Sequence, residues 1–294
     1  MGEGRGQLNG QIAIVVGGHS GFGEAISRLF AREGAHVVVA ARRADLVDER
    51  AAAVGGTGVT CDITDDDQVR SLVEGTVTRL GPISAFVNCA GFEQSTLIAE
   101  LTPDKVRAMV EVQLVGALFC MRHAGNAMAA SGGGAFLSIS SLTAQNPARG
   151  LAAYASSKAG VEYATKIAAV EYGDRNVRFN TVAASLIETP MTARHFSVPP
   201  AIQALREMTP LGRMGSSDDI AQAALYLCGP MGAYVTGQTL CVDGGASLLA
   251  LPTPQMYADA GRRWAEQAGA AGASSGGAQS AGAPGAGAQS AGAP

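Results

Sequence analysis

Short runs of β-branched and other apolar residues alternate along the chain with longer segments of helical periodicity. Short apolar runs bounded by turn residues are typical of buried strands, and apolar residues spaced three and four apart are typical of amphipathic helices. Strands are predicted at Ile12–Val16, Val37–Ala40, Gly58–Cys61, Ala85–Asn88, Ala135–Ser140, Val177–Val182 and Thr239–Val242. Helices are predicted at Gly23–Glu33, Asp65–Leu80, Lys105–Ala130, Ala153–Gly173 and Ser217–Leu227.

This alternation predicts the fold class. Successive strand–helix–strand units with right-handed crossovers build a parallel sheet with helices on both faces. We therefore expect an α/β fold with a doubly wound, Rossmann-type parallel sheet of about seven strands. Thr64 and Ser216 are the expected N-caps of the second and the last of these helices.

The composition changes after about residue 250. Residues 268–294 consist almost wholly of Gly, Ala, Ser, Gln and Pro, and the octapeptide GAQSAGAP occurs there twice. Such a segment cannot offset the entropy of ordering itself, so we expect a disordered tail. We also expect a flexible amino terminus over residues 1–7 and one domain over residues 8–250. Residues 251–267 would form either a helix docked on the domain or a neighbour, or a frayed helix.

Charge, hydropathy and cysteine content argue against several classes of protein. The formal net charge is -4 and the basic residues are scattered, so nucleic acid is not an expected partner. The apolar runs are far shorter than the roughly 20 residues that span a bilayer, and the amino terminus lacks the apolar core of a secretion signal. We therefore expect a cytoplasmic protein without a membrane segment. The cysteines fit reduced thiols better than disulfides, and no pattern predicts a metal site.

A glycine-rich turn follows the first predicted strand directly and precedes the first predicted helix. Its sequence is Gly17-Gly18-His19-Ser20-Gly21-Phe22-Gly23. Small residues let the backbone approach a diphosphate closely, and the free amides and dipole at a helix start favour its negative charge. An ordinary tight strand-to-helix turn is the alternative interpretation.

The spacing Gly-x3-Gly-x-Gly resembles the TGxxxGxG signature of the short-chain dehydrogenase/reductase family, with Val16 where that family usually has Thr. The resemblance continues through further motifs and spans about residues 8–248. These motifs are Asn88-Cys89-Ala90-Gly91, Tyr154-x3-Lys158, Asn180-Thr181-Val182, Ile187-Glu188-Thr189-Pro190-Met191, Pro210-Leu211-Gly212-Arg213 and Val242-Asp243-Gly244-Gly245. The resemblance implies an oxidoreductase that uses a nicotinamide dinucleotide to interconvert a carbonyl and an alcohol.

The end of the second predicted strand bears on the choice of cofactor. Ala41 stands where an NAD enzyme would carry an acidic side chain that binds the adenosine ribose, and Arg42 and Arg43 follow it. A guanidinium beside the ribose can bind a 2′-phosphate, which favours NADPH. NADH stays possible because the two arginines would also be expected in a solvated loop, and Ser20 stands where many NADPH-using relatives carry a second basic residue.

The resemblance also assigns other cofactor contacts. Asp62 matches the acidic residue that touches adenine, Ala90 and Gly91 leave space for the adenine ribose, and the backbone near Ile187 would hold the carboxamide. Together, the expected cofactor-binding residues are Gly17, His19, Ser20, Gly21, Phe22, Gly23, Arg42, Arg43, Asp62, Ile63, Asn88, Ala90, Gly91, Tyr154, Lys158, Ile187 and Thr189.

Tyr154 and Lys158 are four residues apart on a predicted helix and so share one face. An ordinary Tyr pKa of about 10 is too high for efficient proton exchange near neutral pH, and a nearby ammonium would lower it. Taken alone, the two residues also fit a surface helix pair. By resemblance, Ser141 hydrogen-bonds the substrate oxygen, Tyr154 gives it a proton, and Lys158 orients the nicotinamide ribose.

Two departures from the family pattern concern catalysis. Gln113 stands where the family usually has Asn, whose main chain helps to hold a water that connects the lysine to solvent. Ala184 and Ser185 stand where the family usually has Pro-Gly beside the nicotinamide. These departures motivate a second hypothesis, a nucleotide-binding sensor or scaffold that keeps the fold without turnover.

The expected substrate lid, Leu186–Thr209, is rich in apolar residues, which suggests a hydrophobic ketone or a 3-oxoacyl-type carbonyl. These side chains would equally pack the lid on the domain. Glu93, Gln94 and His195 can add polar specificity. Enoyl reductases of the family space their Tyr and Lys farther apart, so the resemblance favours carbonyl reduction. By analogy, the two long helices would form the interface of a homodimer or homotetramer.

Overall fold

The computed structural model of the protein describes residues 6–197, 199–249, 258–259 and 262. The chain divides into two units, Met1–Leu248 and Leu249–Pro294, and the fold and site below belong to the first unit. Most of the amino terminus expected to be flexible and of the expected docking segment, and the whole expected tail, lie outside the described residues. Within residues 1–7, the Gln7 amide donates to a carboxylate oxygen of Glu33 at 2.8 Å.

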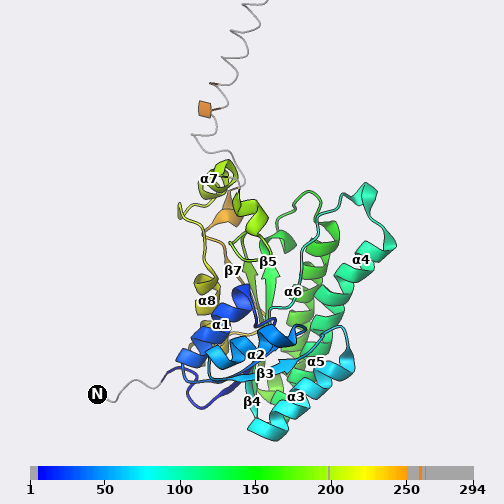
Figure 1. The fold of residues 1–294 in the computed structure, drawn as a ribbon, viewed down its shortest axis with the longest axis vertical. Coiled ribbons are helices and arrows are strands. Elements are labelled where there is room, and N and C mark those ends of the chain that lie inside the picture. Colours follow the sequence, from blue (N-terminus) through cyan, green and yellow to red (C-terminus); the bar gives the residue numbers. More distant parts are fainter. Residues whose placement is uncertain (1–5, 198, 250–257, 260–261, 263–294) are drawn as a thin grey trace, which may run out of the picture. The chain divides into compact units, whose positions relative to one another are not determined.

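Seven parallel strands form one sheet in the order β3-β2-β1-β4-β5-β6-β7 (Figure 1). Their bounds are β1 Ile12–Val16, β2 His36–Ala41, β3 Thr57–Thr60, β4 Ile83–Asn88, β5 Gly134–Ser141, β6 Val177–Ala184 and β7 Thr239–Val242. The expected fold class and every predicted strand are thereby confirmed, with small shifts at the ends. Because all the strands run in the same direction, their carboxyl ends meet at one edge of the sheet.

Helices cover both faces of the sheet, as Figure 1 shows. Helices α1 and α8 pack together on one face, and α3, α5 and α6 cover the other. The bounds are α1 Gly21–Arg32, α2 Ala44–Ala53, α3 Asp66–Leu80, α4 Pro103–Val110, α5 Gly116–Ala130, α6 Ala152–Tyr172, α7 Pro199–Glu207 and α8 Ser217–Cys228. Helices α2 and α7 were not predicted from the sequence.

The single long helix expected over Lys105–Ala130 is interrupted. Helix α4 ends at Val110, a π-helical turn spans Glu111–Val115, and α5 begins at Gly116. A π-helical turn widens the hydrogen-bonding pattern of the helix, and such turns are frequent at functional sites. In this protein it carries Gln113, whose side chain is buried.

One of the two expected N-caps is wrong by one residue. Asp65, not Thr64, caps α3: its side chain accepts from the Gln68 amide, while the Thr64 hydroxyl donates to Asp62. A carboxylate competes well for this position because it also interacts favourably with the positive end of the helix dipole. Ser216 is confirmed as the cap of α8, where it forms a reciprocal capping box with Asp219.

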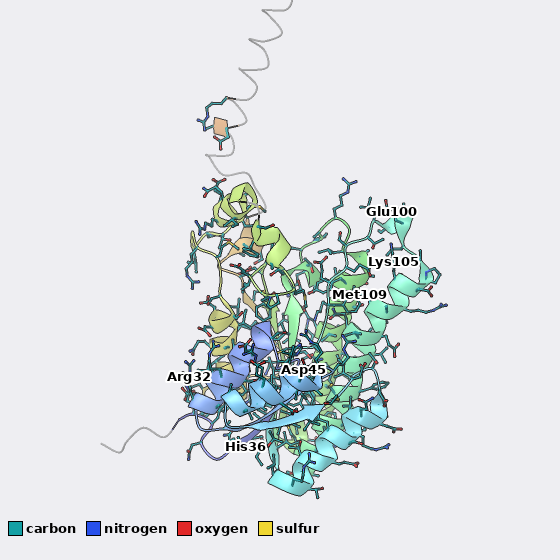
Figure 2. All side chains as sticks on the ribbon, viewed as in Figure 1. Arg32, His36, Asp45, Glu100, Lys105 and Met109 are labelled. Carbon is teal, nitrogen blue, oxygen red and sulfur yellow. The ribbon has the colours of Figure 1, made fainter. Side chains whose placement is uncertain are left out.

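Aromatic rings stack in the core on the face of the sheet that α3, α5 and α6 cover. Phe86, Phe136 and Phe179, on the neighbouring strands β4, β5 and β6, stack with ring centroids 5.4 and 5.2 Å apart. On the periphery, Met109 of α4 is buried, whereas Glu100 in the turn before that helix is exposed (Figure 2).

All five cysteines are free thiols, as expected. No helix among the described residues is long and apolar enough to cross a membrane.

Candidate active site

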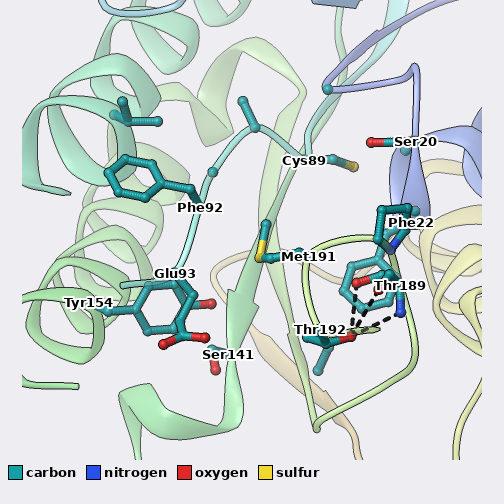
Figure 3. Close-up of a pocket in the computed structure, with 18 of the residues that line it drawn as sticks. Ser20, Phe22, Cys89, Phe92, Glu93, Ser141, Tyr154, Thr189, Met191 and Thr192 are labelled. Carbon is teal, nitrogen blue, oxygen red and sulfur yellow. Dashed lines mark hydrogen bonds between the residues drawn. The ribbon is translucent and has the colours of Figure 1, made fainter. Parts of the chain in front are cut away.

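A cavity of about 980 Å³ opens at the carboxyl edge of the sheet, between the glycine turn after β1 and the loops after β4, β5 and β6. Every residue expected to bind the cofactor lines it, apart from Asn88 and Lys158. Of the expected catalytic residues, Ser141 and Tyr154 line it, whereas Lys158 and Gln113 are buried behind its wall. Figure 3 shows Ser141 and Tyr154 on one side of the cavity and Phe22 and Thr189 on the other.

The glycine turn at one end of the cavity has no room for a side chain at Gly17 or Gly23. A Cβ atom on Gly23 would lie 2.3 Å from the Gly17 carbonyl oxygen, and one on Gly17 would lie 2.9 Å from the Ala90 amide nitrogen. Gly17 also has a φ of 72°, in the left-handed region that favours glycine. Helix α1 starts at Gly21, and the Ser20 side chain makes no capping bond there. The turn therefore fits a diphosphate held by backbone amides at a helix start.

A basic cluster lies beside this turn. Arg42 and Arg43, which follow β2, line the cavity with His19, and the Arg43 guanidinium lies 2.5 Å from His19 Nε2. Because arginine has only donors, Nε2 must accept, so the ring is neutral and carries its proton on Nδ1. Nδ1 is buried without a partner among the described residues. Burial, then the charges of Arg43 and Arg42, lower the pKa of His19.

The segments after β3 and β4 complete the nucleotide side. Asp62 Oδ1 accepts from the amide and the hydroxyl of Thr64, at 3.0 and 2.9 Å, which holds the carboxylate at the start of the loop. The buried Asn88 accepts from the Ala90 amide at 3.1 Å and so shapes the turn after β4.

Ser141 and Tyr154 meet at the other end of the cavity. Ser141 ends β5, where its hydroxyl lies 2.9 Å from that of Thr143 and accepts from the Thr143 amide at 3.2 Å. Tyr154, in the first turn of α6, lies close enough to Ser141 for that hydroxyl to lower the pKa of the phenol. Two hydroxyls from different elements therefore converge on one point, where they can hold and protonate an oxygen atom.

The expected lowering of the Tyr154 pKa is wrong for this structure. Burial raises the pKa of Tyr154, the hydrogen bond with Ser141 offsets part of that rise, and the Glu93 carboxylate adds to it. Lys158 does not reach the phenol, because its ammonium donates to the Ile139 carbonyl oxygen at 2.8 Å. The ammonium lies 5.8 Å from the centre of the Tyr154 ring.

Lys158 is itself strongly affected by its surroundings. Its side chain is buried, and the loss of solvation lowers the pKa of its ammonium to about 8, against the opposing influence of Cys89 and Glu162. A lysine that titrates near neutral pH is suited to proton exchange, and such shifts cluster at functional sites.

The Gln113 side chain packs against the loop after β4 and hydrogen-bonds to its backbone. Its side chain is 2% exposed, and Nε2 donates to the Phe92 carbonyl oxygen at 2.5 Å. A Cβ atom on Gly91 would lie 2.8 Å from Gln113 Oε1, so the loop packs directly on the amide. Gln113 Oε1 is buried without a partner among the described residues.

Several residues of the cavity were not singled out from the sequence. Thr192 accepts from the Thr189 amide at 2.9 Å and donates to the Ile187 carbonyl oxygen at 2.6 Å, which closes the segment after β6 into a compact turn (Figure 3). Phe92 and Arg149 also line the cavity. Of these residues, only Thr192 could have been found from the sequence, because it lies three residues after Thr189 and threonine hydroxyls often bond to nearby backbone. The side chain of His195 is outside the described part of the structure.

Comparison with known proteins identifies the family. Residues 16–247 match the family described as enoyl-(acyl carrier protein) reductase. Carbonyl reductase family member 4 of Danio rerio is 34% identical over 81% of this chain and 99% of its own length. The 3-oxoacyl-[acyl-carrier-protein] reductase of Thermotoga maritima is 34% identical over 81% of this chain and 98% of its own. A short-chain type dehydrogenase/reductase from Mycobacterium ulcerans superimposes with a TM-score of 0.78 at 31% identity, covering 82% of this chain and 91% of that one.

The chain belongs to the short-chain dehydrogenase/reductase family. It is accordingly an oxidoreductase acting between CH–OH and C=O groups with a nicotinamide dinucleotide. The glycine turn and the basic cluster agree with that assignment, because they leave room and charge for a dinucleotide at the carboxyl edge of the sheet.

Proposed function

We propose that this short-chain dehydrogenase/reductase uses NADPH to reduce a hydrophobic ketone or a 3-oxoacyl-type carbonyl to an alcohol. One observation carries the proposal: the paired hydroxyls of Ser141 and Tyr154 lie in the same cavity as the glycine turn. Hydride donor and proton donor must approach one carbonyl group from fixed directions, and a shared cavity supports that arrangement.

In this mechanism the bound dinucleotide supplies the hydride. Ser141 donates a hydrogen bond to the carbonyl oxygen and holds it beside Tyr154. The raised pKa of Tyr154 keeps its phenol protonated near neutral pH, so the phenol can give its proton as negative charge develops on that oxygen. Lys158, buried behind the phenol, contributes a positive charge that stabilises the phenolate left behind.

The preference for NADPH rests on the basic cluster. Arg42, Arg43 and the neutral His19 can together surround a 2′-phosphate with donors, and the expected position of an acidic residue is taken by Ala41. NADH is the alternative cofactor, because an exposed arginine pair can also remain solvated.

The walls of the cavity support a hydrophobic carbonyl substrate. Phe92, Leu142, Leu151, Leu186 and Met191 line the cavity that holds the paired hydroxyls. Carbonyl reduction is preferred to reduction of a C=C bond because Tyr154 and Lys158 are four residues apart and because both relatives described above are named for carbonyl reduction.

The decisive test follows NADPH oxidation by absorbance over a panel of bulky ketones. Tyr154→Phe should reduce the rate of ketone reduction by about a hundredfold to ten-thousandfold, the usual contribution of a positioned general acid. Tyr234→Phe is the matched control, because Tyr234 is an exposed tyrosine that does not line the cavity. Undiminished turnover by Tyr154→Phe would refute the catalytic assignment. Binding of NADPH without reduction of any ketone would favour the sensor or scaffold hypothesis.

We also propose that the protein acts in the cytoplasm as a homodimer or homotetramer assembled through α5 and α6. These helices expose apolar side chains, including Val170 at 84% and Tyr163 at 67%. Exposed apolar surface of this kind marks interfaces between proteins. Sedimentation of the wild type and of Val170→Glu tests the assembly, and a monomeric wild type would overturn it.

A further inference from the structure

A carboxylate lies beside the two hydroxyls that are proposed to hold the reacting carbonyl. Figure 3 shows Glu93 projecting from the loop after β4 toward Tyr154 and Ser141. Glu93 lines the cavity and is partly buried, and its charge acts on the Tyr154 phenol. The carboxylate is therefore close to the place where a substrate would present its carbonyl oxygen.

The backbone that carries Glu93 is fixed on both sides. Gln113 donates to the carbonyl oxygen of the preceding residue, Phe92, at 2.5 Å. On the far side, the Thr96 amide donates to the Gly150 carbonyl oxygen at 2.7 Å, which ties this loop to the segment that leads into α6. Two anchors this close together restrict the movement of Glu93 relative to Tyr154.

The surroundings determine what the carboxylate can recognise. The cavity that Glu93 lines has apolar side chains such as Phe92, Leu142 and Met191, and Arg149 also lines it. A charged acceptor in such surroundings gains strongly from a hydrogen-bond donor and disfavours another negative charge. Glu93 also has a partner within the protein. A carboxylate offers about four acceptor positions, so that partner does not prevent it from binding a ligand.

We propose that Glu93 sets the substrate class of this site by accepting a hydrogen bond from a hydroxyl group on the carbon next to the reacting carbonyl. The preferred substrates are then α-hydroxy ketones with an apolar remainder, and vicinal diols in the direction of oxidation. Carbonyl compounds with a carboxylate at that carbon are rejected. The inference rests on the proposed function, since it takes Tyr154 and Ser141 to hold the carbonyl oxygen.

The test uses three ketones that share a phenyl group. Propiophenone and 2-hydroxyacetophenone differ in a terminal methyl or hydroxyl group of similar size, and benzoylformate carries a carboxylate next to its ketone. The kcat/KM values for the three are compared in the wild type, Glu93→Gln and Glu93→Leu. Ratios between variants cancel the intrinsic reactivity of each ketone. Glu100→Leu is the control, because Glu100 is an exposed glutamate farther along the same loop and does not line the cavity.

The preference of the wild type for 2-hydroxyacetophenone over propiophenone should fall by about tenfold to a hundredfold in Glu93→Leu, the range for a hydrogen bond to a charged group. Glu93→Gln keeps an acceptor oxygen and should lose less, while its relative activity on benzoylformate rises because the repelling charge is gone. As a readout independent of turnover, 2-hydroxyacetophenone should raise the Tm of the wild type more than that of Glu93→Leu.

The outcomes separate the two proposals. If the wild type reduces propiophenone and the substrate ratios are the same in Glu93→Leu, the role of Glu93 is refuted and the reductase function stands. If no ketone is reduced by any variant, the reductase function itself fails. Equal changes in Glu100→Leu would also overturn the inference, because they would show a general effect of charge.

Discussion

The two ends of the cavity are built in different ways. The end at the glycine turn is made of backbone packed so closely that a Cβ atom on Gly23 would lie 2.3 Å from a carbonyl oxygen. The end at Tyr154 is made of side chains on separate elements, with Ser141 on β5 and Glu93 on the loop after β4. Only the first end is specified by a short, continuous stretch of sequence.

The difference separates what the fold imposes from what the substrate requires. A diphosphate needs amides and space, which one turn provides, and the same turn serves any dinucleotide-dependent reaction. A carbonyl substrate needs a particular set of side chains, which loops can exchange without disturbing the sheet. We therefore expect substitutions at the first end to affect folding and cofactor binding together, and substitutions at the second end to affect turnover more than folding.

The largest effect should come from Gly23→Ala. The added Cβ would press on the Gly17 carbonyl oxygen, and because backbone cannot swing aside as a flexible side chain can, the turn must deform. We expect loss of measurable NADPH binding by calorimetry and a fall of about 1–3 kcal/mol in the free energy of unfolding, as for other overpacked sites.

Gly173→Ala provides the matched control for that substitution. Gly173 follows α6 with helical dihedral angles, φ -62° and ψ -37°, and a Cβ there meets nothing within 4 Å. This change should leave NADPH binding intact and stabilise the protein by about 0.4–1 kcal/mol through the unfolded state. Normal NADPH affinity in Gly23→Ala would contradict the backbone-built description of the turn.

Lys158→Met tests the end built from side chains. Removal of the buried ammonium should lower the rate of ketone reduction by about a hundredfold or more, while NADPH still binds and far-ultraviolet circular dichroism is unchanged. Lys166→Met is the control, because Lys166 is exposed on the same helix.

The pH dependence of the rate of ketone reduction is a second test of the role of Lys158. Its pKa is lowered to about 8, so the ammonium is charged below that value and loses its proton above it. Reduction by the wild type should therefore be fastest below pH 8 and fall as the pH rises through it, with Tyr154 still protonated because its own pKa is raised. A rate that stays constant up to pH 10 would show that the charge of Lys158 is not needed.

The same contrast explains what the sequence could predict. The sheet, the glycine turn and the Tyr154–Lys158 spacing were predictable because each is a local pattern with a local physical cause. The direction of the Tyr154 pKa shift was not, because it depends on burial and on Glu93, which is distant in sequence. The break between α4 and α5 was also missed, since a π-helical turn keeps the apolar periodicity on either side and has no sequence signature of its own.

The third expected effect concerns the choice between cofactors. Arg43→Ala removes a guanidinium that lines the cavity next to His19, and we expect NADPH to bind about tenfold to a hundredfold more weakly. NADH lacks the 2′-phosphate. Its affinity should therefore change by less than about threefold, because the loss of one exposed charge that contacts no phosphate has only a small effect. Calorimetry with both nucleotides measures the two changes. Equal losses for NADPH and NADH would mean that Arg43 acts on the turn and not on the 2′-phosphate.

The smallest effect, and the most direct probe of the nucleotide end, is a proton taken up by His19. In the free protein the ring is neutral, because Arg43 donates to Nε2 and because burial and the charges of Arg43, Arg42 and Arg50 lower its pKa against a weaker opposing effect of Glu24. A phosphate dianion bound beside the ring would raise that pKa. Binding should then take up protons and strengthen as the pH falls toward 6.

Calorimetry of NADP⁺ binding in buffers with different ionisation enthalpies measures this uptake. The 2′-phosphate itself titrates near pH 6 and releases protons on binding as a dianion, so the quantity that matters is the difference between the wild type and His19→Gln. At pH 6 we expect the two proteins to differ by a fraction of one proton taken up and by a few-fold in the Kd for NADP⁺. Both differences should vanish at pH 8, and neither should be seen with NAD⁺. An equal difference for NAD⁺ would place His19 against the diphosphate, and the charge that selects the 2′-phosphate would then rest on the arginines alone.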